Sequence, residues 1–132
     1  MVLTPTYHVM EMYNVHQDAL MLPITVASGH YMLAGKKLEA ISASASRDKA
    51  GAVHISVVNI DALVEHEVTI DMGDLAAKSV AGRILRSDKL QDHNTFDNPQ
   101  KIQPALYSGA VLKGKELSVK IPPFSVVVLE LK

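Results

Sequence analysis

Hydrophobic and polar residues alternate in two neighbouring stretches near the middle of the chain, residues 41–48 and residues 53–61. The first alternates isoleucine and alanine with serine, and the second alternates valine and isoleucine with histidine and serine. Because successive side chains of a strand leave opposite faces of the sheet, a period of two is typical of a half-buried strand. The short link between the stretches contains Gly51, which is free to adopt the positive φ of a tight turn. The pattern predicts a β-hairpin at the centre of a sheet.

The polar face of the first strand carries the small side chains Ser42, Ser44 and Ser46. A row of serines would let another layer of structure approach the sheet closely. A nucleophilic serine is often set in a Gly-x-Ser-x-Gly turn, which this sequence lacks. We therefore interpret the three serines as the small face of a strand.

Helical spacing of apolar residues occurs near the start of the chain, from residue 4 to about residue 19. Thr4 can cap this helix, and Pro5 suits its first position, where the missing N–H costs no hydrogen bond. Four residues recur on one stripe: Val9, Met12, Tyr13 and His16. Pro23 prevents the helix from continuing. A lone helix ahead of a β-rich chain is unusual for a self-contained sandwich.

Further short strands are predicted along the rest of the chain, with turn signals between them. They cover residues 22–26, 64–72, 78–86, 106–112, 116–121 and 125–131, with a turn at 28–30. Gly82 interrupts the third of these as a bulge or a point of close approach. The final strand is apolar on both faces, which places it inside a sheet. The fold class expected is mainly β, an antiparallel, jelly-roll-like β-sandwich preceded by one α-helix.

Residues 87–104 show no periodicity and are rich in polar side chains. Irregular connections longer than about 12–15 residues inside a compact domain are usually functional or docked on other structure. We expect this segment to dock on neighbouring structure.

The amino-acid composition limits the kinds of function that this chain can have. A chain of 132 residues with 48% hydrophobic and 20% charged residues is typical of one globular domain. The net charge of −1 provides no one-signed field for nucleic acid or an anionic membrane. Cysteine is absent, no apolar stretch approaches the ~20 residues of a membrane span, and no secretion signal is visible. These features are compatible with a cytoplasmic or a periplasmic location.

Candidate metal ligands are scattered. His8 and His16 are eight residues apart with no His-Glu-x-x-His motif, so chance placement is favoured over a zinc site. Asp88, Asp92 and Asp97 suggest a calcium loop, but the central glycine and bidentate glutamate of an EF-hand are missing. We expect no metal and no cofactor.

Candidate catalytic carboxylates and sugar-stacking rings are equally sparse. Glu65 and Glu67, two residues apart, would share one face of a strand at about 6.6 Å, and we interpret them as a solvated edge. The chain has no tryptophan, four tyrosines and two phenylalanines, whereas sugar-binding modules usually present rows of aromatic rings. We expect no catalytic residue in this chain.

Residues 3–19, LTPTYHVMEMYNVHQDA, resemble the end of the catalytic barrel in α-L-arabinofuranosidases of glycoside hydrolase family 51. The resemblance continues in the same order through SASASR at 42–47, VVNID at 57–61, GRIL at 82–85, DHNTFDNP at 92–99 and the closing segment 122–131. It therefore covers nearly the whole chain.

The resemblance implies a (β/α)₈ barrel that carries the chemistry and a C-terminal jelly-roll-like sandwich beside it. Catalysis in that family uses two glutamates in a retaining mechanism, the acid/base lying in an Asn-Glu dipeptide that this chain lacks. Residues 1–20 would be the last helix of the missing barrel, and residues 21–132 the C-terminal sandwich. The partner implied is that barrel.

The leading interpretation is a non-catalytic accessory domain of an arabinofuranosidase, whose parent removes terminal non-reducing α-L-arabinofuranosyl residues from arabinan or arabinoxylan oligosaccharides. A carbohydrate-binding module and an oligomerisation module are the alternatives. Without its barrel, the helix would leave a wet apolar stripe, so self-association through Met12 and Tyr13 is expected.

Overall fold

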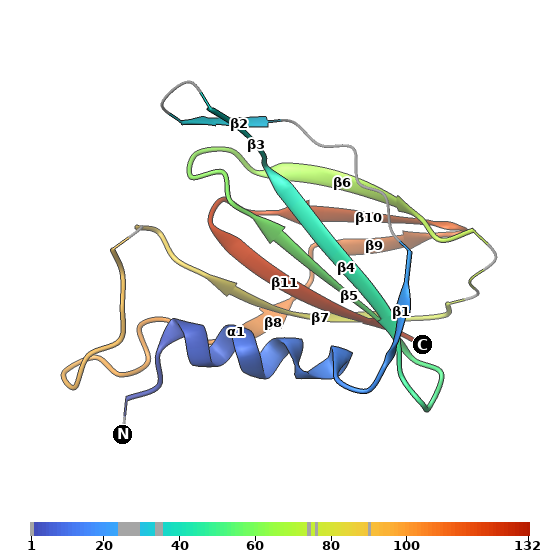
Figure 1. Ribbon diagram of the computed structural model, residues 1–132, viewed down its shortest axis with the longest axis horizontal. Coiled ribbons are helices and arrows are strands. Elements are labelled where there is room, and N and C mark those ends of the chain that lie inside the picture. Colours follow the sequence, from blue (N-terminus) through green and yellow to red (C-terminus); the bar gives the residue numbers. More distant parts are fainter. Residues whose placement is uncertain (1, 24–29, 34–35, 74, 76, 90) are drawn as a thin grey trace.

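The computed structural model describes residues 2–23, 30–33, 36–73, 75, 77–89 and 91–132. Two antiparallel sheets face each other, and a helix lies along the outer face of the larger sheet (Figure 1). The six-stranded sheet consists, in spatial order, of β1 (Leu20–Leu22), β4 (Ile41–Arg47), β5 (Val53–Asn59), β11 (Ser125–Leu131), β7 (Val80–Arg86) and β8 (Ala105–Tyr107). The three-stranded sheet consists of β6 (His66–Asp71), β10 (Glu116–Ile121) and β9 (Ala110–Lys113), and β2 (His30–Leu33) pairs with β3 (Lys36–Glu39).

The main core lies between the two large sheets, as the predicted sandwich requires. Each strand contributes alternate residues to it, because side chains of one parity share a face. The most deeply buried members are Ile41, Leu117, Val119, Ile121, Val127 and Leu129. Tyr107 on β8 also links the sheets, since its hydroxyl donates to the Lys120 carbonyl on β10. The predicted fold class, mainly β with an N-terminal helix, is confirmed.

The predicted central hairpin is confirmed as β4 and β5, paired from Ile41 opposite Asn59 to Arg47 opposite Val53. Its turn is closed by Asp48, whose Oδ1 accepts the backbone N–H groups of Ala50 and Ala52 at 2.9 Å each. Gly51 adopts a φ of 91° there, as expected.

The predicted interior position of the last strand is also confirmed, because β11 pairs with β5 on one side and with β7 on the other. Gly82 of β7 keeps an unbroken register opposite Leu129, so it is not a bulge. A Cβ at this position would lie 2.8 Å from Leu129 Cδ2 and 3.0 Å from Tyr107 Cδ1. Gly82 therefore marks a close approach.

Several predicted boundaries are wrong. The helix α1 (Pro5–Tyr13) ends in a 3₁₀ turn, η1 (Asn14–His16), rather than near residue 19, because the chain must reverse into β1. Asp18 makes this reversal with a φ of 57°. Residues 106–112 form two strands in different sheets, and the β2–β3 hairpin was not predicted. The predicted strand 22–26 overlaps β1 only at Leu22, and residues 24–29 lie outside the described residues.

The expected wet stripe on the helix is also wrong. Met12 is only 1% exposed and packs with Leu85, Ile102 and Val128 on the outer face of the chain's own sheet. Val9, Tyr13 and Val15 are packed against this second apolar cluster. The helix therefore packs on the sheet of its own chain, and Met12 and Tyr13 need no second copy to cover them.

Residues 87–89 and 91–104 form no strand, and this segment docks on the N-terminal segment. The Asn94 side chain donates to the backbone carbonyls of Leu3 at 2.7 Å and Ile102 at 2.8 Å, and accepts the Ile102 N–H at 2.7 Å. Ile102, buried to 5% exposure, then inserts beside Met12.

Asn59, at the end of β5, is a buried polar anchor with 1% exposure. Its amide nitrogen lies 3.1 Å from each of the carbonyls of Val64, Ile121 and Pro122, and its Oδ1 accepts the Asp61 N–H. The Asn59 side chain thus forms hydrogen bonds with backbone groups at both connections that join the sheets, the one between β5 and β6 and the one between β10 and β11.

We predict that Asn59→Ala lowers the free energy of unfolding by about 2–3 kcal/mol, because it leaves buried backbone groups without partners. Urea unfolding followed by circular dichroism measures this. Asn98→Ala, on the exposed loop, is the matched control and should change stability little. Equal stability of the two variants would contradict the anchor role.

Candidate functional site

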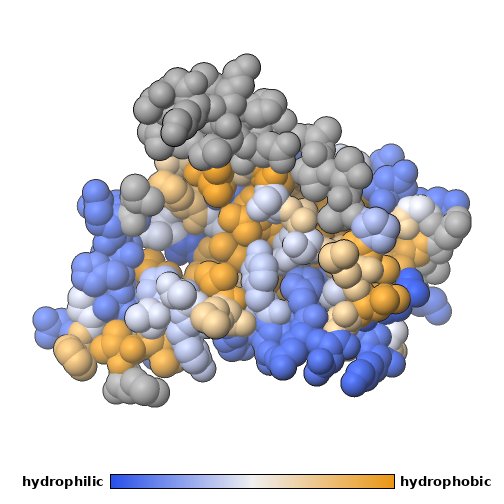
Figure 2. All heavy atoms as spheres, in the orientation of Figure 1, coloured by the Kyte–Doolittle hydropathy of each residue, from blue (hydrophilic) through white to orange (hydrophobic). Residues whose placement is uncertain are grey.

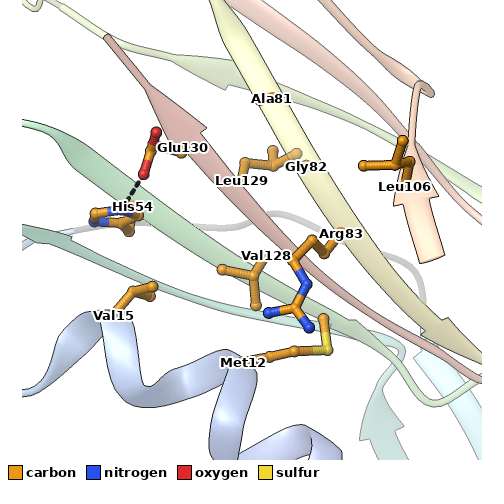
Figure 3. Close-up of a pocket in the computed structure, with 10 residues that line it drawn as sticks. All are labelled: Met12, Val15, His54, Ala81, Gly82, Arg83, Leu106, Val128, Leu129 and Glu130. Carbon is orange, nitrogen blue, oxygen red and sulfur yellow. Dashed lines mark hydrogen bonds and ion pairs between the residues drawn. The ribbon is translucent and has the colours of Figure 1, made fainter. Parts of the chain in front are cut away.

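A groove of about 240 Å³ lies between the helix and the outer face of the six-stranded sheet. Its lining comes from six elements. The residues, drawn in Figure 3, are Met12 (α1), Val15 (η1), His54 (β5), Ala81, Gly82 and Arg83 (β7), Leu106 (β8), and Val128, Leu129 and Glu130 (β11). The floor is mostly apolar, and its charged groups lie toward the edges. Strand alternation places Arg83, Val128 and Glu130 on this outer face, whereas Leu129, which also borders the groove, belongs to the main core.

Arg83 joins the sheet to the helix at one edge of the groove. Its guanidinium lies 3.0 Å from both Oε atoms of Glu11, in a two-pronged arrangement. Figure 3 shows the Arg83 side chain extending toward Met12 on the helix. Because both side chains are nearly half exposed, the pair orients the helix more than it stabilises the fold.

His54 forms the polar end of the groove with Glu130, which lies directly opposite it on β11. His54 Nε2 is 3.0 Å from Glu130 Oε2, and the histidine side chain is 6% exposed. Its Nδ1 is buried without a hydrogen-bond partner, and Asp48 Oδ2 is 3.9 Å away. Lys132 and then His54 hold the pKa of Glu130 below its ordinary value.

His16 of η1 is inserted between two serines of the sheet. Its Nδ1 lies 2.5 Å from Ser46 Oγ, and its Nε2 lies 3.0 Å from Ser56 Oγ. Burial, followed by the nearby His54, lowers the pKa of His16 from its ordinary value, which favours the neutral ring. The serine face of β4 thus receives another layer of structure at Ser46, as the sequence indicated, whereas Ser42 and Ser44 remain exposed.

The candidate metal ligands are not brought together. His8 lies edge-on to Tyr7, whereas His16 lies between the serines. Asp88 pairs with Arg86, and Asp92 pairs with Lys101 and accepts from Ser87. Among the described residues, no group of three or more histidine and carboxylate side chains could hold a metal ion.

The candidate serines and glutamates do not form a reactive arrangement. Ser46 is 4% exposed and engaged by His16, while Ser42 and Ser44 are exposed on the sheet. Glu67 is exposed on β6 and accepts from the Ser118 hydroxyl, and Glu65 is exposed just before the strand. In the groove, the carboxylates of Glu130 and nearby Glu11 are both engaged in ion pairs. The geometry suits the attachment of a helix to a sheet.

A family model described as "Alpha-L-arabinofuranosidase C-terminal domain" matches residues 1–125. The chain belongs to the family of α-L-arabinofuranosidase C-terminal domains. The C-terminal domain is 42% identical, over 133 aligned residues, to an intracellular exo-α-L-arabinofuranosidase of Bacteroides ovatus, covering 100% of this chain and 26% of that protein.

Solved structures agree in fold. The crystal structure of a family 51 arabinofuranosidase from Xanthomonas axonopodis pv. citri matches with a TM-score of 0.97 at 36% identity, over 100% of this chain and 27% of that one. A family 51 enzyme from Bifidobacterium longum shares the fold, with a TM-score of 0.87 at 20% identity, over 99% of this chain and 26% of that one. The C-terminal domain thus spans about a quarter of the length of these relatives. Among its described residues, no helix has the length and apolar character needed to cross a membrane.

The sequence singled out Met12 and Gly82 but none of the polar residues that line the groove. His54, Arg83 and Glu130 read as ordinary solvent-facing positions of strands, because the pairing register that places His54 opposite Glu130 is not visible in a single sequence. The sequence does contain one signal for structure on the outer face of this sheet. Residues of β11 are apolar on both sides of the strand, so a second layer must cover that face.

We predict that His16 makes the stability of this domain depend on pH. Its folded-state pKa is lowered, so the unfolded chain binds the proton more readily, and stability is fully present above the ordinary value of 6.5 and is lost as the pH falls below it. His16→Gln should show a smaller loss of unfolding free energy over this range. His93→Gln, at an exposed position, is the control and should keep the original pH dependence. Identical slopes for His16→Gln and the unmodified chain would contradict the prediction.

Proposed function

We propose that this C-terminal domain serves as the accessory domain of an α-L-arabinofuranosidase and packs against the catalytic domain through the outward face of α1. The observation that carries the proposal is the two-sided apolar character of the helix. Met12 is buried on the domain's own sheet, whereas Tyr7 is 49% and Met10 is 71% exposed on α1. An exposed apolar surface of this kind is typical of a contact with another structure.

The enzyme that contains this domain is proposed to remove terminal non-reducing α-L-arabinofuranosyl residues from arabinan or arabinoxylan oligosaccharides with retention. The name of the Bacteroides ovatus relative, an exo-α-L-arabinofuranosidase, supports this assignment. Residues 1–20 are proposed as the last helix of the catalytic barrel and residues 21–132 as the sandwich. In this division α1 would pack on both the sandwich and the catalytic barrel, which agrees with its two apolar faces.

The domain is proposed to contribute no catalytic residue. Retaining hydrolysis needs two carboxyl groups about 5–5.5 Å apart on either side of the scissile bond. In the groove, Glu130 is paired with His54 and Lys132, and Glu11 is paired with Arg83. Both carboxylates are therefore engaged in ion pairs that orient the helix and the edge of the groove.

We predict that the purified domain leaves p-nitrophenyl α-L-arabinofuranoside unhydrolysed above the buffer rate. The assay is the release of p-nitrophenol at saturating substrate. Turnover that survives repurification and disappears in Glu65→Gln or Glu67→Gln would overturn the non-catalytic role.

Sugar binding is the less favoured alternative, because the comparisons identify a different family of domain and the chain has no tryptophan and few aromatic rings. We predict no saturable heat of binding when arabinan oligosaccharides are titrated into the domain in a calorimeter. Binding in the millimolar range or tighter, abolished by Phe96→Ala, would favour a carbohydrate-binding role instead.

Self-association through α1 is the second candidate. Because Met12 and Tyr13 pack on the domain's own sheet, a second copy would have to contact Tyr7 and Met10 instead. A two-fold contact can cover such a face with the same face of another copy. Light scattering over a range of concentrations tests it. A dimer that Met10→Ser converts to a monomer would support self-association, whereas we predict a monomer for both proteins because the proposed occupant of this face is the catalytic domain.

A further inference from the structure

We propose that the turn at residues 95–98 presents Phe96 as a second anchor against the catalytic domain, beside the outward face of α1. This inference rests on the proposed function and names a residue of the domain interface that the family assignment does not supply. The surface concerned, called the N-terminal corner below, consists of Phe96, Tyr7 and Met10.

Phe96 is 88% exposed. A single exposed apolar side chain is ordinary on a protein surface. Phe96 is an aromatic side chain carried by a turn whose backbone is fixed by hydrogen bonds. The Thr95 N–H donates to the Asn98 carbonyl at 3.2 Å, and the Asn98 N–H donates to Thr95 Oγ1 at 3.1 Å, so both ends of the turn are closed around Phe96.

The segments on both sides of the turn are fixed as well. On one side Asn94 bonds both Leu3 and Ile102, as described above. Lys101, on the other side, lies 2.7 Å from Asp92, which also accepts the Ser87 hydroxyl at 2.6 Å. Ordering a loop costs conformational entropy, and an aromatic residue on an already ordered backbone binds a partner without incurring the backbone part of that cost again. Aromatic residues held in this way are typical of interface centres.

The turn lies where the catalytic domain is expected to approach. The bond from Asn94 to Leu3 places it against the residue that precedes the helix cap Thr4. Figure 1 shows the N-terminus, the start of α1 and this loop at the same lower left corner, and Figure 2 shows apolar side chains reaching the surface there. In members of this family the catalytic part precedes the C-terminal domain, and the Xanthomonas chain has most of its length outside the 27% matched here.

A chimera tests the proposal, in which this chain replaces the matching C-terminal quarter of the Bacteroides ovatus enzyme. Thermal unfolding is compared for Phe96→Ala in the chimera and in the isolated chain. Because Phe96 is exposed, the substitution should leave the isolated chain's midpoint unchanged, and in the chimera we expect the midpoint to fall by at least ~2 °C. Val111→Ala, at a half-exposed position on β9 of the other sheet, is the matched control and should change neither protein.

Met10→Ser separates this inference from the proposed function. If Met10→Ser destabilises the chimera and Phe96→Ala does not, docking through α1 stands and the Phe96 anchor is overturned. If neither variant affects the chimera, docking through this corner is overturned as a whole. A fall of equal size in the isolated chain would show that Phe96 supports its own domain, which also overturns the anchor.

Discussion

The six-stranded sheet is covered on both faces, and the arrangement of the whole chain follows from that constraint. On the inner face, Val127 and Leu129 of β11 pack into the core shared with the three-stranded sheet. On the outer face, Val128 of the same strand packs against Met12 of the helix. A strand that is apolar on both sides needs two covering layers, and burying a side chain the size of Met12 stabilises the fold by about 1.5–3 kcal/mol.

The outer layer is positioned by polar pairs around this apolar contact. Arg83 holds the helix through Glu11, and the two serines below η1 hold His16. The chain therefore retains its helix without help from another domain. The same helix keeps Tyr7 and Met10 at the surface, which makes it suited to join two units. A firmly attached helix transmits the position of one domain to the other, and this is the role we assign to it.

The sequence was most informative where one strand buries one face. The hairpin of β4 and β5 was predicted, and the predicted bounds 116–121 agree with β10, because period-two patterning there reports burial directly. The predicted bounds 125–131 also agree with β11, which is marked instead by apolar residues on both faces. Residues 106–112 look like one strand locally, but their two halves join different sheets, which depends on pairing far away in the chain. The polar end of the groove likewise depends on strand register, because the pairing of β5 with β11 places His54 opposite Glu130. For Met12, the amphipathic stripe was correctly recognised, but its partner was sought outside the chain.

Hydrogen exchange of backbone amides in the isolated domain tests most directly whether the sandwich alone holds the helix. The account predicts that amides of α1 after its first turn exchange far more slowly than those of an unstructured peptide, with protection that falls when Met12 is replaced by alanine and β11 stays protected. Exchange of α1 at the rate of an unstructured peptide in the unmodified domain, with β11 still protected, would contradict it.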